Sequence, residues 1–146
     1  DKKGRTVLIN ATSSTSLSAV KNALANGAAV NFCNKDGQTA LFFAAKINHP
    51  LLLPTLLEAG AHVNIQDTRG QTPLLVAVSN NVFRTVVSLT NAGADPTLLD
   101  ATVISPLTLA LAQRQCEVSD LFFQSEIDLN KQDKHGNSLL MGLVLR

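Results

Sequence analysis

Tryptophan and tyrosine are missing from this chain of 146 residues, and charged residues make up only 16% of it. Six phenylalanines are its only aromatic residues, so few side chains could stack on the bases of a single-stranded nucleic acid. The 12 basic and 11 acidic residues leave a formal net charge of +1, whereas binding to phosphates requires an excess of Lys and Arg. We therefore expect no nucleic-acid partner.

The sequence also lacks long apolar runs. No stretch of 18 apolar residues occurs, and no charged segment followed by an apolar one opens the chain. A transmembrane helix and an export signal would each need such a stretch. We expect neither membrane insertion nor export.

Sequence patterns that are typical of catalytic, metal-binding or phosphate-binding sites are missing too. His49, His62 and His135 share no metal-ligand spacing with one another or with the cysteines. The glycines form no phosphate-binding loop, and no Gly-x-Ser-x-Gly turn is present. The sequence therefore predicts no catalytic site, no metal and no cofactor.

What the chain does contain is a period of 33 residues without insertion or deletion. Five hydroxyl residues follow it: Thr6, Thr39, Thr72, Ser105 and Ser138. Five leucines do the same: Leu8, Leu41, Leu74, Leu107 and Leu140. A fixed period in this range indicates a solenoid, in which each unit buries its apolar face against the next.

Each repeat has the same parts in the same order. A turn with Gly37 or Gly70 permits positive φ, Thr39 or Thr72 can cap a helix, and Pro73 suits a first helical position. Small residues in that helix would let neighbouring helices approach: Ala11, Ala44, Ala77 and Ala110. A second apolar helix ends where a glycine is expected at the C′ position: Gly27, Gly60 and Gly93. Each unit is thus a helix, a turn, a second helix and a hairpin.

The order Asn34-Lys35-Asp36-Gly37-Gln38-Thr39-Ala40-Leu41, and its counterpart from Asp67 to Leu74, resembles the ankyrin-repeat pattern D-x-x-G-x-T-P-L-H-x-A-A. The resemblance covers one domain, 1–146, with repeats 1–33, 34–66, 67–99 and 100–132 and a partial fifth, 133–146. It implies an all-α repeat solenoid of stacked helix-turn-helix units with projecting β-hairpin loops. The tetratricopeptide repeat is the alternative, but its period is 34 residues and it has no Gly-Ala-x-Val-Asn hairpin.

Repeat four departs from the pattern. Val103 replaces the turn glycine and Glu126 replaces the helix-ending glycine, which puts the geometry of its hairpin in doubt. In repeat two, Pro50 suits a first helical position, and Pro54 predicts a kink or a delayed start of the second helix.

Two features concern the surroundings of the chain. Cys33 and Cys116 lie about two and a half repeats apart, which is too far for a disulfide in a stacked solenoid. Free cysteines indicate a reducing intracellular compartment. We expect the cytoplasm, with the nucleus as the alternative. Leu139, Leu140, Leu143 and Val144 have no second helix to cover them, so we expect this chain to be part of a longer array.

The resemblance further implies a non-catalytic module that binds a protein or peptide through hairpin tips and the inner helices. The contact residues that it implies are Lys35, Asp36, Gln38, Lys46, Ile47, Thr68, Arg69, Gln71, Ser79, Asn80, Ala101, Thr102, Ile104, Ala112 and Gln113. The alternative is a structural or regulatory segment that packs within a larger enzyme, adaptor or channel.

An apolar run in the last full hairpin predicts a binding hot spot. Leu99, Val103 and Ile104 stand where repeat three has Gln66, Gly70 and Gln71. Phe43 and Ile47 would extend this apolar cluster along the groove. The alternative is that these side chains fill a reshaped hairpin.

Two further features of the sequence allow two interpretations each. Repeat one carries a net charge of +3 and repeat four −3, either as scatter or as a gradient that orients a partner. Asn64 and Asn130 are similar to hairpin asparagines that are hydroxylated in this family, or else they only stabilise the turn.

Overall fold

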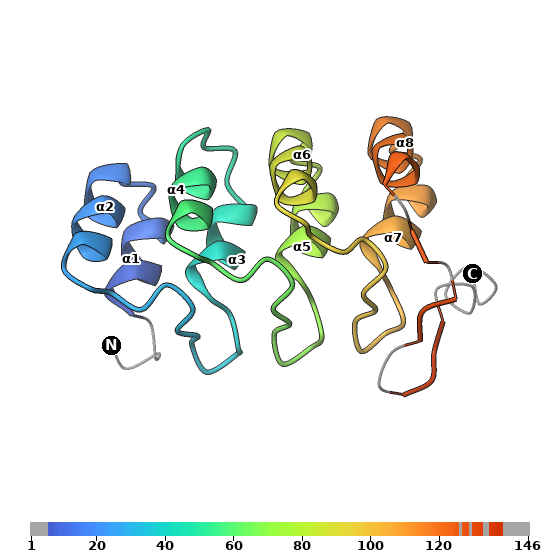
Figure 1. Cartoon of the computed structure of the whole chain (residues 1–146), viewed down its shortest axis with the longest axis horizontal. Coiled ribbons are helices and arrows are strands. Elements are labelled where there is room, and N and C mark those ends of the chain that lie inside the picture. Colours follow the sequence, from blue (N-terminus) through green and yellow to red (C-terminus); the bar gives the residue numbers. More distant parts are fainter. Residues whose placement is uncertain (1–5, 126, 129, 133–134, 139–146) are drawn as a thin grey trace.

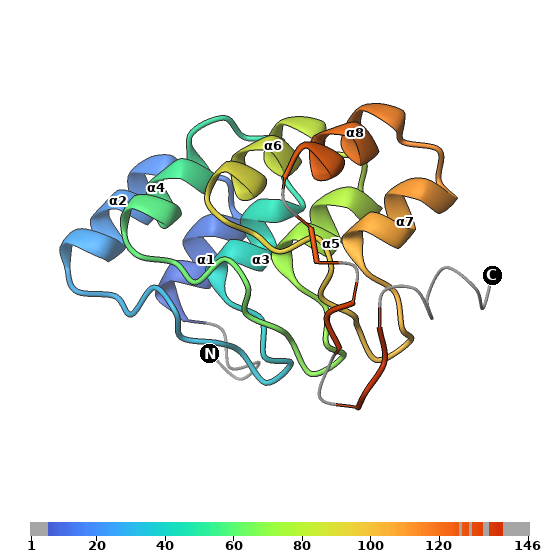
Figure 2. The same ribbon diagram turned by 45° about the vertical axis from the view of Figure 1, so that its right-hand side comes forward.

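The computed structural model describes residues 6–125, 127–128, 130–132 and 135–138. Within them eight α-helices form two rows (Figures 1 and 2). The inner row consists of α1 (Val7–Ser13), α3 (Ala40–Ala45), α5 (Pro73–Ser79) and α7 (Pro106–Ala112). The outer row consists of α2 (Leu17–Ala25), α4 (Leu52–Glu58), α6 (Phe83–Asn91) and α8 (Cys116–Gln124). The loops between repeats all project to the side of the inner row (Figure 1), so the predicted all-α solenoid is confirmed.

The repeated hydroxyl residues stand at the N-caps of the inner helices. The side chains of Thr6 and Thr72 accept hydrogen bonds of 3.1 Å from the backbone N–H groups of Ile9 and Leu75, and Ser105 caps α7 in the same way. Thr39 occupies the N-cap of α3, but its side chain caps no N–H group. The capping role predicted for Thr39 is therefore wrong, although its position is right.

The small residues of the inner helices are buried, as predicted. Ala44, Ala77 and Ala110 are each at most 1% exposed, and α3 packs against both α1 and α5. Phe42 of α3 is also fully buried within this stack. The core is thus continuous from one repeat to the next, as a solenoid requires.

The outer helices end as the glycines predict. At the end of α4, Gly60 has a φ of 87°, its N–H donates to the carbonyl of Leu57, and the N–H of Ala61 donates to that of Leu56. These two bonds form a Schellman motif, which needs a left-handed residue at C′. In repeat four, Glu126 lies outside the described residues.

The second helix of repeat two starts late. Three outer helices begin at equivalent positions, Leu17, Phe83 and Cys116, but α4 begins at Leu52, two residues after the equivalent Pro50. Pro54 is the third residue of α4, where a missing N–H costs no helix hydrogen bond. The predicted delayed start is confirmed, whereas Pro50 precedes the helix and does not open it.

The projecting loops are tight turns. The Asn34 N–H donates to the Gln38 carbonyl at 2.9 Å and the Asp67 N–H to that of Gln71 at 2.9 Å, which closes each loop like a hairpin. The described part of the chain contains no strand, only one isolated bridge, Gln132 with Ser138. Leu139, Leu140, Leu143 and Val144, with most of the partial repeat, lie outside it.

Candidate protein-binding surface

Hydrogen bonds between successive loops hold the tips in place. The backbone N–H of Thr68 donates to the carbonyl of Asp36 at 2.9 Å, and the N–H of Ala101 donates to that of Arg69 at 2.9 Å. Each bond therefore joins the second residue of one repeat to the third residue of the repeat before it. The tips form an ordered edge along the solenoid on which exposed side chains keep fixed positions.

A buried carboxylate organises the tip of repeat three. The Oδ1 atom of Asp67 accepts hydrogen bonds of 2.9 Å from the N–H groups of Arg69 and Gln71, and Oδ2 accepts one of 3.3 Å from Nε2 of Gln38 in the preceding loop. Asn34 and Asp100 bind their own loops in the same way. In such turns a short carboxylate or amide side chain fixes the backbone that follows it.

The turn glycines allow the loops to approach closely. Gly70 has a φ of 75°, and a Cβ atom there would lie 3.1 Å from the backbone N of Ala101 and from Cα of Asp100. Val103 occupies the equivalent position in repeat four and adopts the same conformation, with a φ of 61°. The hairpin of repeat four thus keeps the family geometry, but a β-branched residue stands in a left-handed conformation that costs about 1–2 kcal/mol.

We expect Val103→Gly to raise the free energy of unfolding by about 0.5–1 kcal/mol, because relief of this strain exceeds the larger entropy that glycine loses on folding. Urea unfolding followed by circular dichroism measures the change. Gly70→Val is the matched reverse variant and should destabilise the chain by more than that, since its Cβ would also press on the next loop. A Val103→Gly variant less stable than the wild type would show that side-chain packing outweighs the strain.

The structure sorts the predicted contact residues by exposure. Exposed are Lys35, Asp36, Lys46, Thr68, Arg69, Ser79, Asn80, Ala101, Thr102, Ala112 and Gln113. Half-buried are Phe43, Ile47, Gln71, Val103 and Ile104. The Lys46 ammonium lies 5.6 Å from the centre of the Phe43 ring, so a cation and an aromatic face meet at the end of α3.

Two of the predicted contact residues are buried, and we correct their assignment. Gln38 is 9% exposed because its amide reaches Asp67 in the next loop. Leu99 is 6% exposed, and its carbonyl accepts a hydrogen bond from Nε2 of Gln66. Both side chains therefore offer little surface to a partner. The apolar run of the last full hairpin is therefore divided, with Leu99 turned inward and Ile104 half accessible.

The candidate hydroxylation residue Asn64 has a structural role. Its Nδ2 donates to the Gly93 carbonyl at 3.2 Å, and its Oδ1 accepts from the Asp95 N–H at 2.8 Å. Asn31 makes the same pair of bonds one repeat earlier. This favours the turn-stabilising interpretation for Asn64, while Asn130 is exposed on its own turn.

An ion pair joins repeats three and four. Lys131 bonds the carboxylate of Asp95, which also accepts from the hydroxyl and the N–H of Thr97. Burial raises the pKa of Asp95, but these donors outweigh it, and the pKa of the carboxyl lies below its ordinary value. The stabilisation is therefore present above the ordinary pKa of an aspartate and is lost as the pH falls through the lowered one.

The remaining expectations concern the cysteines, metal binding and membrane insertion. Cys33 and Cys116 are exposed and form no disulfide. In the part of the chain that the structure describes, no three His, Cys, Asp or Glu side chains are placed to hold a metal ion. None of the helices there has the length and apolar character that crossing a membrane requires.

Comparison with known proteins adds one finding. The family model of ankyrin repeats in three copies matches residues 1–67 and 44–133, which together cover most of the chain. No curated protein matches the sequence significantly.

Proposed function

This chain belongs to the ankyrin-repeat family, whose repeats generally serve as protein–protein interaction modules, and on that premise we propose that it is a non-catalytic module that binds a partner protein or peptide. Binding would occur on the loop tips and on the adjoining ends of the inner helices. We place the module inside the cell, in the cytoplasm first, because both of its cysteines are free thiols.

The proposal rests on how buried and exposed positions differ along the repeats. The buried position is alanine in each inner helix, as at Ala44, Ala77 and Ala110, whereas the exposed position two residues later is Lys46, Ser79 or Ala112. The scaffold is thus uniform while the exposed row changes from repeat to repeat. Such a row on a rigid frame is the arrangement with which a solenoid recognises an extended partner.

Hydrophobic contact would come from repeats two and four. Phe43 and Ile47 are half-buried at the end of α3, and Ile104 is half-buried in the loop before α7. Such side chains gain free energy when a partner removes their remaining surface from water. Lys46 and Arg69 are exposed beside them and would add charge selectivity.

The test is a substitution at Ile104. We expect Ile104→Asp to weaken partner binding about 5- to 30-fold, which corresponds to about 1–2 kcal/mol. Binding is measured by calorimetry with partners selected from a display library of protein fragments from the source organism. Leu121→Asp is the matched control, because Leu121 is also half-buried but lies on the outer helix α8.

Equal losses in the two variants would mean that reduced stability, not lost contact, weakens binding. Unchanged binding by Ile104→Asp would remove the hot spot from the proposal. If every selected fragment came from the chain's own protein, the alternative would hold, in which this domain packs within a larger enzyme, adaptor or channel.

A further inference from the structure

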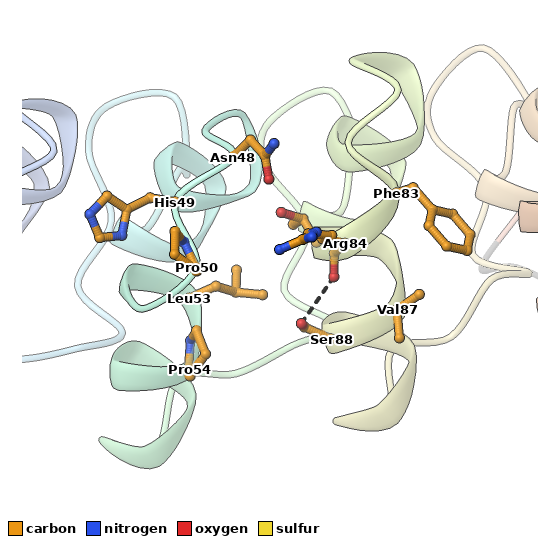
Figure 3. Close-up of a pocket in the computed structure, with 10 residues that line it drawn as sticks. Asn48, His49, Pro50, Leu53, Pro54, Phe83, Arg84, Val87 and Ser88 are labelled. Atoms are coloured by element: carbon orange, nitrogen blue, oxygen red, sulfur yellow. Dashed lines mark hydrogen bonds between the residues drawn. The ribbon is translucent and has the colours of Figure 1, made fainter.

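A groove on the outer row, away from the loop tips, lies between α4 and α6 (Figure 3). It encloses about 320 Å³. Pro50, Leu53 and Pro54 line it from repeat two, and Arg84 and Ser88 line it from α6. The proposed function makes no use of this groove.

The groove lies beside the late start of α4. Where the other outer helices have their first residues, repeat two has an irregular connection, and Asn48, His49 and Pro50 of that connection line the space. Two missing helical residues correspond to about 3 Å of helix. Pro50 and Pro54 thus both line a recess between neighbouring helices.

The two walls of the groove differ in chemistry. On the α4 side, Pro50 and Pro54 have no N–H to donate, and Leu53 forms an apolar floor. On the α6 side, the Arg84 side chain points toward Leu53, and the Ser88 hydroxyl donates to the backbone carbonyl of Arg84 at 3.0 Å (Figure 3). An apolar surface and a guanidinium thus face the same space.

The charge of the groove is positive and uncompensated. The Arg84 side chain is exposed, and among the described residues it has neither a carboxylate within 4 Å nor a hydrogen-bond acceptor. The lining includes His49 but no acidic residue. Glu58, at the end of α4, is exposed one turn beyond Pro54 and does not line the groove.

We propose that this groove is a second docking site, which takes a peptide segment of a partner protein with an acidic residue next to a bulky apolar one. The carboxylate would pair with the Arg84 guanidinium, a partner whose planar fork suits a carboxylate. The apolar side chain would lie on Leu53 between the two prolines. The volume fits a few side chains of an extended peptide.

The experiment uses a phage-displayed library of random 12-residue peptides selected on the whole chain. Synthetic peptides from the enriched clones are then tested by fluorescence anisotropy against the wild type, Arg84→Glu and Lys21→Glu. Lys21 is exposed on the outer helix α2 and lies outside the groove, so its variant makes the same change in net charge. Ile104→Asp is included to identify peptides that bind the loop tips.

We expect a class of peptides with Asp or Glu beside Leu, Ile or Phe. Arg84→Glu should weaken their binding at least about tenfold, whereas Lys21→Glu and Ile104→Asp should change it less than about twofold. Replacing the peptide's acidic residue by Lys should restore binding to Arg84→Glu, which a merely structural effect of the substitution would not do.

Three outcomes would overturn the proposal. The first is a selection without peptides that depend on Arg84, and the second is an equal loss with Lys21→Glu. The third is self-association in sedimentation velocity that Arg84→Glu abolishes, which would assign the groove to a second copy of the chain. Peptides that depend only on Ile104 would support the loop-tip function while refuting this one.

Discussion

Phe42→Ala is expected to lower the free energy of unfolding by about 3–5 kcal/mol. Phe42 is fully buried in α3, and α3 contacts the inner helices on both sides, α1 and α5. Removing the ring therefore takes contacts from a stack in which each repeat is held by its neighbours. The neighbouring helices already pack closely through their buried alanines. They therefore cannot move in to fill the cavity that the removed ring leaves.

Urea unfolding followed by circular dichroism at 222 nm measures this loss. Phe32→Ala is the matched control, since it removes the same ring from a side chain that is 58% exposed in a loop. We expect that variant to stay within about 0.5 kcal/mol of the wild type. Similar losses in the two variants would mean that stability does not reside in the stack of inner helices.

Much of this fold could be predicted because the repeats are strictly in phase. The period of 33 residues predicts the N-cap positions of α1, α5 and α7. It also predicts the left-handed glycines Gly37, Gly60 and Gly70. The period could not show how a substituted position adapts. Thr39 stands at its N-cap without bonding an N–H, and Val103 keeps the geometry of the glycine that it replaces. The turn at Val103 is held by Asp100 of the same loop, whose Oδ1 accepts from the N–H groups of Thr102 and Ile104, and the period alone does not show that these bonds tolerate a valine.

The candidate surface was less predictable than the fold. Repeat register correctly placed Lys46, Ser79 and Arg69 at exposed positions, but it gave no sign that Gln38 is buried by a hydrogen bond to the next repeat. A contact between residues 29 positions apart, Gln38 and Asp67, depends on how the loops stack. The interloop role of Gln66, which bonds the carbonyls of Gly70 and Leu99, was missed for the same reason.

The outer groove shows a different limit. The sequence indicated that Pro54 would delay or bend one helix, and that local effect is present. The recess beside that helix, which Arg84 also lines, depends on α6 as well, a helix of the next repeat. The residue pattern of one repeat predicts the backbone of that repeat. It does not predict the groove that forms between the helices of two neighbouring repeats.

Asp67→Ala is expected to cost about 2–3 kcal/mol, although the residue lies in a loop. Its carboxylate accepts from two backbone N–H groups and from the Gln38 amide, and hydrogen bonds to charged groups contribute about 1.5–3 kcal/mol. The ion pair with Arg69, at 3.8 Å, adds little because the Arg69 side chain is 67% exposed. Alanine would leave the buried side-chain amide of Gln38 without this acceptor.

Asp67→Asn tests whether the loop needs the negative charge of this side chain or only an oxygen atom that accepts hydrogen bonds. Asn34 stands at the equivalent position of repeat two, and its Oδ1 accepts from the N–H groups of Asp36 and Gln38 at 3.0 and 2.9 Å. An asparagine at 67 should therefore keep both backbone bonds. Its NH2 group would replace the Oδ2 acceptor, and a turned Gln38 amide could accept from it through Oε1, so the loss should be less than about 1 kcal/mol. Urea unfolding of the two variants side by side measures the difference. If asparagine were as damaging as alanine, the negative charge itself would hold the loops of repeats two and three together, and Asn34 and Asp67 would not be interchangeable at this position of the repeat.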